Sequence, residues 1–219
     1  MDLDRATFLI FALLSALIRS CFAIPGLIDL GQSLSDKKYP EVQGYFRVEA
    51  NIIQMKNPRG TTRYYMPCDL IPGYCDPRIT VAIDYETPNN DAGKDSVPFS
   101  RYVQVFDGSR LADVEINKIV SKDICGKSTR KINVRVHAID KDILSDDLID
   151  DFRCYIYTTD PPANKEANAS WSAEQTCEGH NGSHKIIWKY RWFFIPEAEC
   201  RETAGSSGII RRIIPFIGK

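Results

Sequence analysis

Six aspartates lie within the segment HAIDKDILSDDLIDDF, residues 137–152, which continues the alternating run KINVRVHA. They are Asp140, Asp142, Asp146, Asp147, Asp150 and Asp151. A strand that delivers so many carboxylates to one turn brings like charges together, which costs free energy unless something offsets the repulsion. Calcium takes roughly six to eight hard oxygen ligands and suits such a cluster. The cluster therefore predicts a calcium site, with Asp150 and Asp151 interpreted as solvated charge beside it.

The bulk composition is that of a globular protein with a hydrophobic core. Of 219 residues, 43% are hydrophobic and 26% are charged, which suits one domain with appendages. The last 19 residues carry Arg201, Arg211, Arg212 and Lys219 against Glu202, a charge of +3, so the total of −1 leaves −4 on the rest. An acidic domain with so small a basic tail does not favour nucleic acid as a partner.

The first 23 residues have the pattern of a secretory signal. The run TFLIFALLSALIRSCFA is apolar and ends in the small residues Cys21 and Ala23, as a cleavage site requires. Arg19 and Ser20 interrupt the run before it reaches the roughly 20 apolar residues of a membrane span. We therefore expect a secreted, extracellular protein, with residues 1–23 as signal peptide, 24–43 as linker, 44–200 as the folded domain and 201–219 as a basic, apolar tail.

Cysteine usage fits the same compartment. Without Cys21 an even number remains, which predicts up to three disulfides in an oxidising setting. The remaining cysteines are Cys68, Cys75, Cys125, Cys154, Cys177 and Cys200. Their spacing leaves the pairing open, although Cys68 and Cys75 share one polar loop that a disulfide would make rigid.

Two acceptor sequons for N-glycosylation point the same way. Asn168 and Asn181 begin them, and both lie in the polar segment 160–183, which we expect to be a long surface loop. Two sequons in one segment behind a signal peptide carry more weight than one.

Seven segments show period-two alternation or enrichment in β-branched and aromatic residues. They are residues 45–55, 78–85, 101–106, 113–120, 131–140, 153–159 and 184–195. Strands at such short intervals favour an all-β, antiparallel β-sandwich. No helix, internal repeat or low-complexity tract is predicted after the signal.

Two stretches resemble the calcium-binding loops of the C2 domain family. NPRG at 57–60, followed by CDPRITVAID at 75–84, is similar to the first loop and the next strand of a C2 domain. VRVHAIDKDILSDDLID at 134–150 is similar to the third loop. The resemblance covers about residues 44–196 and implies an eight-stranded, C2-like β-sandwich, which leaves one strand to be found.

The same resemblance implies calcium ligands. It places one at Asp76 in the first loop and three in the third loop, at Asp140, Asp142 and Asp147. The other first-loop acid of the family corresponds either to Asn57 or to Asp69.

The two loops also offer groups that suit a binding partner. The first loop supplies Lys56, Arg59, Arg63, Tyr64 and Tyr65, and the third supplies Ile143 and Leu144. Basic residues attract anionic head groups and apolar tips insert among them. Aromatic and Arg residues are equally typical of protein-binding patches. We therefore expect an anionic membrane surface or an extracellular protein as the partner.

Secretion and disulfides within a C2-like frame add a second resemblance. The chain is similar to the C2-like module at the amino terminus of Notch ligands of the Delta and Jagged type. The similarity lies in the strand GYFRVEANIIQM, the cysteine-bearing loop and the CD pair that follows it. The chain ends soon after FFIPEAEC, without the receptor-binding and EGF domains of those ligands. The resemblance therefore implies a stand-alone secreted relative.

Patterns for catalysis are weak. His137 lies within a strand and is expected to be structural. Cys177, His180 and His184 have spacings reminiscent of a zinc site, but the even cysteine count assigns Cys177 to a disulfide. The sequence has no Gly-rich phosphate loop, nucleophile elbow or facing carboxylate pair. We expect a binding module and not an enzyme, either calcium-dependent or a calcium-independent interaction protein.

Overall fold

The computed structural model describes residues 38–69, 73–89 and 97–201. The chain divides between Lys38 and Tyr39, and the fold presented here belongs to the second unit. The predicted signal peptide, most of the predicted linker and the tail from residue 202 onward lie outside the described residues.

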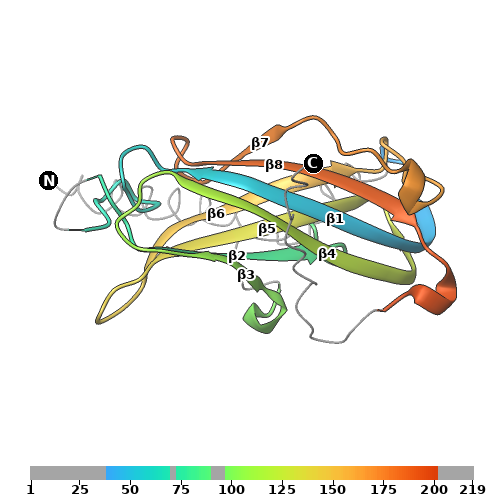
Figure 1. Ribbon diagram of the computed structural model, residues 1–219, viewed down its shortest axis with the longest axis horizontal. Helices are drawn as coiled ribbons and strands as arrows, with labels where there is room; N and C mark the ends of the chain where they lie inside the picture. The colour runs from blue at the N-terminus through green and yellow to red at the C-terminus, as the bar shows by residue number, and fades with distance from the viewer. Residues whose placement is uncertain (1–37, 70–72, 90–96, 202–219) are drawn as a thin grey trace, which may run out of the picture. The chain divides into compact units, whose positions relative to one another are not determined.

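Eight strands form two antiparallel sheets that pack face to face (Figure 1). One sheet has the order β4-β1-β8-β7 and the other β3-β2-β5-β6. The strands are β1 Val42–Lys56, β2 Pro77–Asp84, β3 Val103–Asp107, β4 Val114–Thr129, β5 Lys131–Asp140, β6 Asp147–Tyr157, β7 Gln175–Glu178 and β8 Lys185–Phe194. The predicted all-β, eight-stranded, disulfide-bonded sandwich is confirmed.

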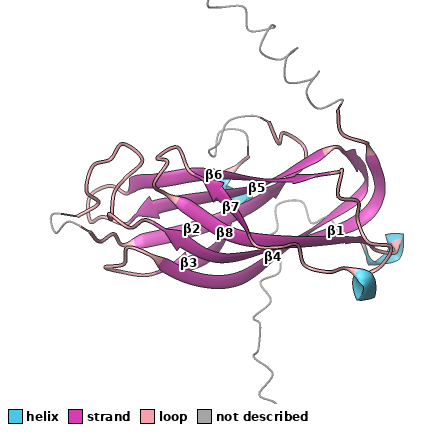
Figure 2. Cartoon of the chain, turned by 90° about the horizontal axis from the view of Figure 1, so that it is seen from above, coloured by secondary structure: helices cyan, strands magenta, loops and turns pink. Residues whose placement is uncertain are grey.

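The core lies between the sheets and follows the period of two that a strand imposes. In β5, Ile132, Val134, Val136 and Ala138 are fully buried. Trp188 is the largest fully buried side chain and comes from the opposite sheet. The strands run lengthwise along the domain (Figure 2). The rows of buried side chains along each strand therefore extend from one end of the sandwich to the other.

Three strands differ from the sequence expectation. The missing strand is β7, inside the segment that was expected to be a loop, where four residues are too few to show a period. β6 begins at Asp147 and not at residue 153, because its acidic residues have partners within the fold. β4 continues to Thr129 and not to residue 120, because its polar residues lie on the outer face, where Asp123 pairs with Arg47 at 2.6 Å.

Three disulfides fix the described chain. Cys68–Cys75 closes part of the connection between β1 and β2, as predicted. Cys125–Cys200 joins β4 to the segment after β8, and Cys154–Cys177 joins β6 to β7, which belong to different sheets. The last of these closes one side of the sandwich covalently.

Helical structure in the described part is limited to short 3₁₀ turns. They are η1 Phe99–Arg101, η2 Glu166–Asn168 and η3 Glu197–Glu199. No helix within the described ranges is long and apolar enough to span a bilayer.

A buried ion pair joins the last residue of β2 to the outer face of β5. Arg135 is fully buried, and its Nε donates to Asp84 Oδ2 at 2.9 Å. The other oxygen of Asp84 accepts the backbone N–H groups of Glu86 and Thr87. Asp84 therefore neutralises a buried cation and begins the turn that covers it.

Replacement of Asp84 should be severely destabilising. Asp84→Ala removes the carboxylate that pairs with the buried Arg135 guanidinium. Because breaking one partner out of a buried ion pair is strongly destabilising, we expect a loss of about 3–5 kcal/mol in the free energy of unfolding. Urea denaturation of the oxidised protein measures this loss. The control is Glu86→Ala, which removes the exposed partner of Arg101 and should cost less than about 1 kcal/mol. Equal losses in the two variants would contradict the role of burial.

Candidate metal centre

Three loops and a hairpin gather at one end of the sandwich, at the left in Figure 1. They are the first loop (residues 57–76), the second loop (108–113), the third loop (141–146) and the β7–β8 hairpin (179–184). Two main-chain hydrogen bonds join the first loop to the other two loops, one at Asp76 and one at Cys75. Lys141 N–H donates to Asp76 O at 3.0 Å, and Cys75 N–H donates to Leu111 O at 3.0 Å. We call this region the loop end.

Asp140 is the buried carboxylate of the loop end. It is the last residue of β5 and continues the core-facing row that includes Val136 and Ala138, so the period of two turns its side chain inward. The side chain is fully buried. Asp76 N–H donates to its Oδ1 at 2.5 Å, whereas its Oδ2 has no hydrogen-bond partner among the described residues. A buried acceptor without a partner is costly and rare, which marks this oxygen as a place for a ligand.

Two more carboxylates complete a cluster of three around Asp140. An oxygen from each of Asp69, Asp140 and Asp142 lies within 4.8 Å of the others. Asp76 is adjacent, but its Oδ1 accepts Arg110 N–H at 2.7 Å. Asp147 faces Asp140 across the β5–β6 register and is exposed. The structure thus brings Asp69, Asp140 and Asp142 together, with Asp76 and Asp147 beside them.

Two acids of this cluster, Asp140 and Asp142, resist ionisation. Burial, joined by the charges of Asp142, Asp69 and Asp76, raises the pKa of Asp140 to about 6 against the lowering effect of the Asp76 N–H. The pKa of Asp142 is raised by desolvation and then by the charges of Asp147 and Asp69, followed by those of Asp146 and Asp76. In both groups desolvation is the largest cause of the raised pKa, and the negative charges of the neighbouring carboxylates add to it. An all-oxygen set of this kind fits calcium.

The basic residues nearby are engaged elsewhere. Lys141 forms an ion pair with Asp107, and Arg78 contacts the same carboxylate at 3.1 Å. These two cations hold the pKa of Asp107 below its usual range. Within the described residues, no ion pair involves Asp69, Asp140 or Asp142.

The first loop has an internal scaffold that uses Asn57. Its Oδ1 accepts Thr61 N–H at 3.0 Å, and its Nδ2 donates to Thr61 O at 3.0 Å and to Cys75 Sγ at 3.3 Å. Gly60 has φ +55°, and a Cβ there would lie 2.3 Å from the backbone of Gly73. Of the two alternatives for the first-loop acid, Asp69 lies in the cluster, whereas Asn57 is consumed in folding the loop.

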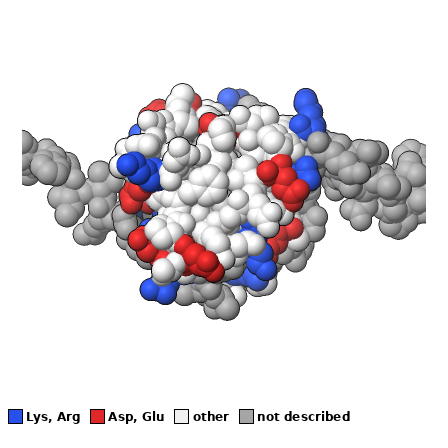
Figure 3. Space-filling model, turned by 90° about the vertical axis from the view of Figure 1, so that its right-hand side faces the viewer, with Lys and Arg blue, Asp and Glu red and all other residues white. Residues whose placement is uncertain are grey.

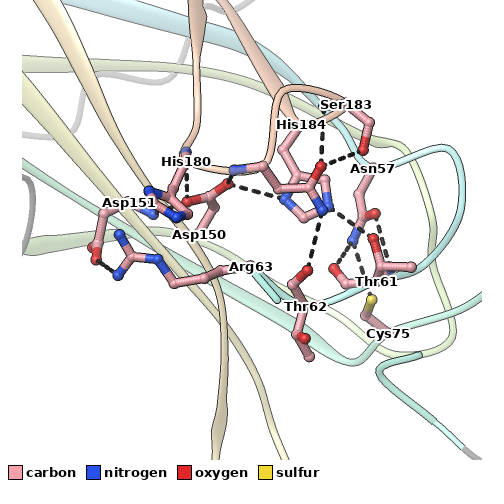
Figure 4. A network of polar contacts seen from close by, with 11 residues as sticks. Asn57, Thr61, Thr62, Arg63, Cys75, Asp150, Asp151, His180, Ser183 and His184 are labelled. Atoms are coloured by element: carbon pink, nitrogen blue, oxygen red, sulfur yellow. Dashed lines mark hydrogen bonds and ion pairs between the residues drawn. The ribbon is translucent and has the colours of Figure 1, made fainter. Parts of the chain in front are cut away.

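Asp150 is the centre of a second buried polar network (Figure 4). It is fully buried and accepts the backbone N–H groups of His180 and Asn181 at 2.9 Å each. His184 Nδ1 donates to it at 3.1 Å, and His184 Nε2 lies 3.1 Å from Thr61 Oγ1. The network therefore ties the β7–β8 hairpin to β6 and to the first loop.

The interpretation of Asp150 and Asp151 as solvated charge was wrong. Their exposed fractions are 0% and 7%. Asp151 contacts His137 Nδ1 at 2.7 Å and the guanidinium of Arg63 at 3.5 Å. Counting back by two from the buried Phe152 places Asp150 on the core face, which is the signal that sequence reasoning missed.

The remaining histidine and cysteine patterns are not metal sites. Cys177 is bonded to Cys154, which removes the ligand from the zinc-like spacing. Cys68 and Cys75 lie close to Asp140, but their sulfurs are bonded to each other and offer no thiolate. Thr61, His184 and Asp150 are aligned like a catalytic relay, yet all three are buried, so their arrangement is structural.

The predicted contact residues belong to the first and third loops and to the strand end before the first loop. Ile143 and Leu144 are 102% and 97% exposed at the tip of the third loop. Tyr64, Tyr65 and Arg59 are exposed on the first loop, and Lys56 is exposed at the end of β1. Arg63 is partly buried by its contact with Asp151. The opposite end of the domain (Figure 3) carries charges of both signs around an uncharged centre.

A solved structure decides the family. The crystal structure of a C2 domain protein from Ramazzottius varieornatus is 45% identical, with a TM-score of 0.71, and the match covers 76% of this chain and 99% of that chain. The chain belongs to the C2 domain family. No protein-family model matches the sequence, and no curated protein matches it either.

More distant solved structures are also similar to this chain. Human GIVD cytosolic phospholipase A2 is 11% identical, with a TM-score of 0.44 over 71% of this chain and 18% of that chain. Drosophila C2-DSL-EGF1 is 12% identical, with a TM-score of 0.42 over 68% of this chain and 67% of that chain. At this distance neither carries an argument about the function of this C2 domain.

The two glycosylation sequons differ in access within the C2 domain. Asn168 is exposed at the end of η2. Asn181 is fully buried, its Nδ2 donates to Thr62 O at 3.2 Å, and its Oδ1 accepts from Ser183. A glycan on Nδ2 would have to displace this hydrogen bond, so the fold opposes the prediction for Asn181 and is compatible with that for Asn168.

Secreted protein should therefore carry a glycan at Asn168 alone. Ser170→Ala and Ser183→Ala each destroy one sequon without changing its asparagine. With expression in eukaryotic cells behind a foreign signal peptide, we expect Ser170→Ala to abolish the mass removed by peptide-N-glycosidase and Ser183→Ala to leave it unchanged. A glycan on secreted Asn181 would contradict the buried position.

The metal-free C2 domain should lose stability as the pH rises through the range in which Asp140 ionises. Because its folded pKa is about 6, above the usual value of 3.8, the folded state holds a proton that the unfolded state releases. Protonated Asp140 costs the folded state nothing below about pH 4. Towards pH 7 its ionisation lowers the free energy of unfolding by about 2–3 kcal/mol. Asp142 acts in the same direction.

Thermal unfolding in excess chelator at pH 4, 5, 6 and 7 tests this, on the wild type and Asp140→Asn. The difference between the two proteins isolates Asp140 from the other acids. We expect the variant to gain in relative stability as the pH rises. A constant difference would show that Asp140 ionises normally.

Proposed function

We propose that this protein is a secreted C2 module that binds calcium at its loop end and thereby engages an anionic phospholipid surface. The observation that carries the proposal is the buried Oδ2 of Asp140, for which the described part of the chain supplies no hydrogen-bond partner. It lies with Asp69 and Asp142 directly beside the exposed pair Ile143–Leu144. A site for a cation and an apolar tip are thus adjacent in the third loop.

Asp69, Asp140 and Asp142 would hold the ion, with Asp76 and Asp147 near enough to contribute. Bound calcium supplies positive charge that offsets the repulsion among these carboxylates. The chain itself supplies little neutralisation at this point, since Lys141 and Arg78 are paired with Asp107. The first and third loops would therefore be held together more firmly when the ion is present.

The surface around the cluster suits a bilayer. Ile143 and Leu144 are almost wholly solvent-accessible, and Tyr64, Tyr65 and Met66 are each more than half exposed. Such side chains are costly to leave in water and gain free energy on entering the head-group region. Lys56 and Arg59, exposed on the first loop, would add attraction to anionic lipids.

Secretion is supported by covalent chemistry. Three disulfides persist in oxidising compartments and are rare in the cytosol. The apolar run before Ala23, which lies outside the described residues, has the composition of a cleaved signal.

A calcium-independent interaction protein, related to the amino-terminal modules of Notch ligands, is the second candidate. The exposed tyrosines of the first loop suit a protein-binding surface.

Calcium should stabilise the folded protein. A ligand at 100 times its dissociation constant that binds only the folded state adds about 2.7 kcal/mol, so the unfolding midpoint in millimolar calcium should rise by several degrees over that in chelator. Asp140→Asn/Asp142→Asn should abolish the rise. Glu197→Gln/Glu199→Gln, a matched loss of charge in η3 at the other end, should preserve it. No rise in the wild type would favour the second candidate.

The apolar tip should govern membrane binding. We expect sedimentation with anionic liposomes to require calcium and to weaken by about tenfold or more in Ile143→Ser/Leu144→Ser, because the inserted apolar area is lost. Phe99→Ser removes an exposed aromatic residue that belongs to η1 and not to the loops of the loop end, and should leave binding unchanged. Undiminished binding in chelator would instead indicate a calcium-independent surface.

A further inference from the structure

We infer that the Cys68–Cys75 disulfide is a positioning element of the calcium site, so that calcium affinity and the stability of this one disulfide depend on each other. The inference rests on the proposed function. It concerns residues that bind no ion themselves and act through the two aspartates next to them.

The sequence places each first-loop acid beside one half of the disulfide. Asp69 follows Cys68, and Asp76 follows Cys75. The sulfur–sulfur bond therefore sets the separation between the backbone segments from which both side chains extend. It does so within a sequence separation of 7, much shorter than that of either other disulfide.

The two cysteines of the disulfide have different backbone contacts. Cys75 is fixed from both sides, since its N–H donates to Leu111 O and its C=O accepts Leu111 N–H at 2.8 Å. The next carbonyl, that of Asp76, accepts Lys141 N–H from the third loop. Cys68 N–H instead donates to Gly60 O within the first loop itself. The disulfide is thus a covalent cross-link, in addition to the main chain, between the segment that carries Asp69 and the strand end that pairs with the third loop.

The sulfur atoms also form part of the wall of the site. Both Sγ atoms lie within 4.8 Å of an Asp140 carboxylate oxygen and of each other. Cys68 and Cys75 are 8% and 1% exposed. The disulfide therefore packs against the buried carboxylate, in the position where solvent would otherwise reach it.

Burial of the sulfurs makes the coupling reciprocal. A dithiol reductant attacks one sulfur, forms a mixed disulfide and leaves as its own cyclic disulfide, so that two electrons and two protons pass to Cys68 and Cys75. The attack requires the first loop to open. Calcium bound by Asp69 and Asp140 holds the loop closed and so hinders the attack. By linkage, if the disulfide raises the affinity for calcium, bound calcium stabilises the disulfide by the same free energy.

Calorimetric titration with calcium chloride tests the positioning role in the full secreted protein. We expect Cys68→Ser/Cys75→Ser to bind calcium about tenfold or more weakly, because one or two backbone residues around Asp69 must be ordered anew on binding. The matched control is Cys125→Ser/Cys200→Ser, which removes a disulfide at the other end of β4. It should lower the unfolding midpoint yet keep the calcium affinity, which separates positioning from general stability.

Reduction kinetics supply a second readout on the unmutated protein. With dithiothreitol and alkylation followed by peptide mass analysis, we expect calcium to slow the reduction of Cys68–Cys75 several-fold and to leave Cys125–Cys200 unaffected. Equal calcium affinity in wild type and Cys68→Ser/Cys75→Ser, or equal reduction rates with and without calcium, overturns the inference alone. A wild-type protein that binds no calcium overturns both the inference and the proposed function.

Discussion

The register of β5 is the constraint on which the loop end depends. Every second residue from Ile132 to Ala138 faces the core, and the next member of that row is Asp140. Because the strand ends there, the carboxylate lies beneath the loops and not in solvent. An apolar residue at this position would close the sandwich with no further demand on the loops. A carboxylate demands partners, and the first and third loops are arranged to supply some of them.

The neighbouring strand β6 meets the same demand in a different way. Asp150 belongs to the core-facing row of Phe152, Cys154 and Ile156, and its oxygens accept from backbone N–H groups and from His184. Gly179 allows this approach, since a Cβ there would lie 2.2 Å from Asp150 Oδ2. Asp150 is therefore satisfied by the protein, whereas one oxygen of Asp140 has no partner within residues 38–69, 73–89 and 97–201. The contrast separates a structural carboxylate from one that suits a ligand.

Regular alternation is what made the fold predictable from sequence. Residues 131–140 were placed at the bounds of β5, because their apolar side chains recur every second position. β7 was missed because four residues show no period, and the start of β6 was missed because Asp150 and Asp151 look like surface charge until their partners are known. Those partners, such as His180 and Arg63, are distant in sequence and follow no local pattern. For the same reason the sequence left Asn57 and Asp69 as alternatives, and it did not reveal that Asn181 is buried.

The Cys125–Cys200 bond determines how the domain would bear mechanical load. β8 pairs with β1 and β7. Without the disulfide, the hydrogen bonds of β8 would be the first to break if the chain beyond Arg201 were pulled. The disulfide passes such tension directly from Cys200 to β4. β4 is held along its whole length by β1, since Val114 pairs with Met55 at one end and Thr129 pairs with Val42 at the other. A force on the carboxyl-terminal segment would therefore be shared across a long sheet pairing in shear, while β8 and the hairpin at the loop end remain unloaded.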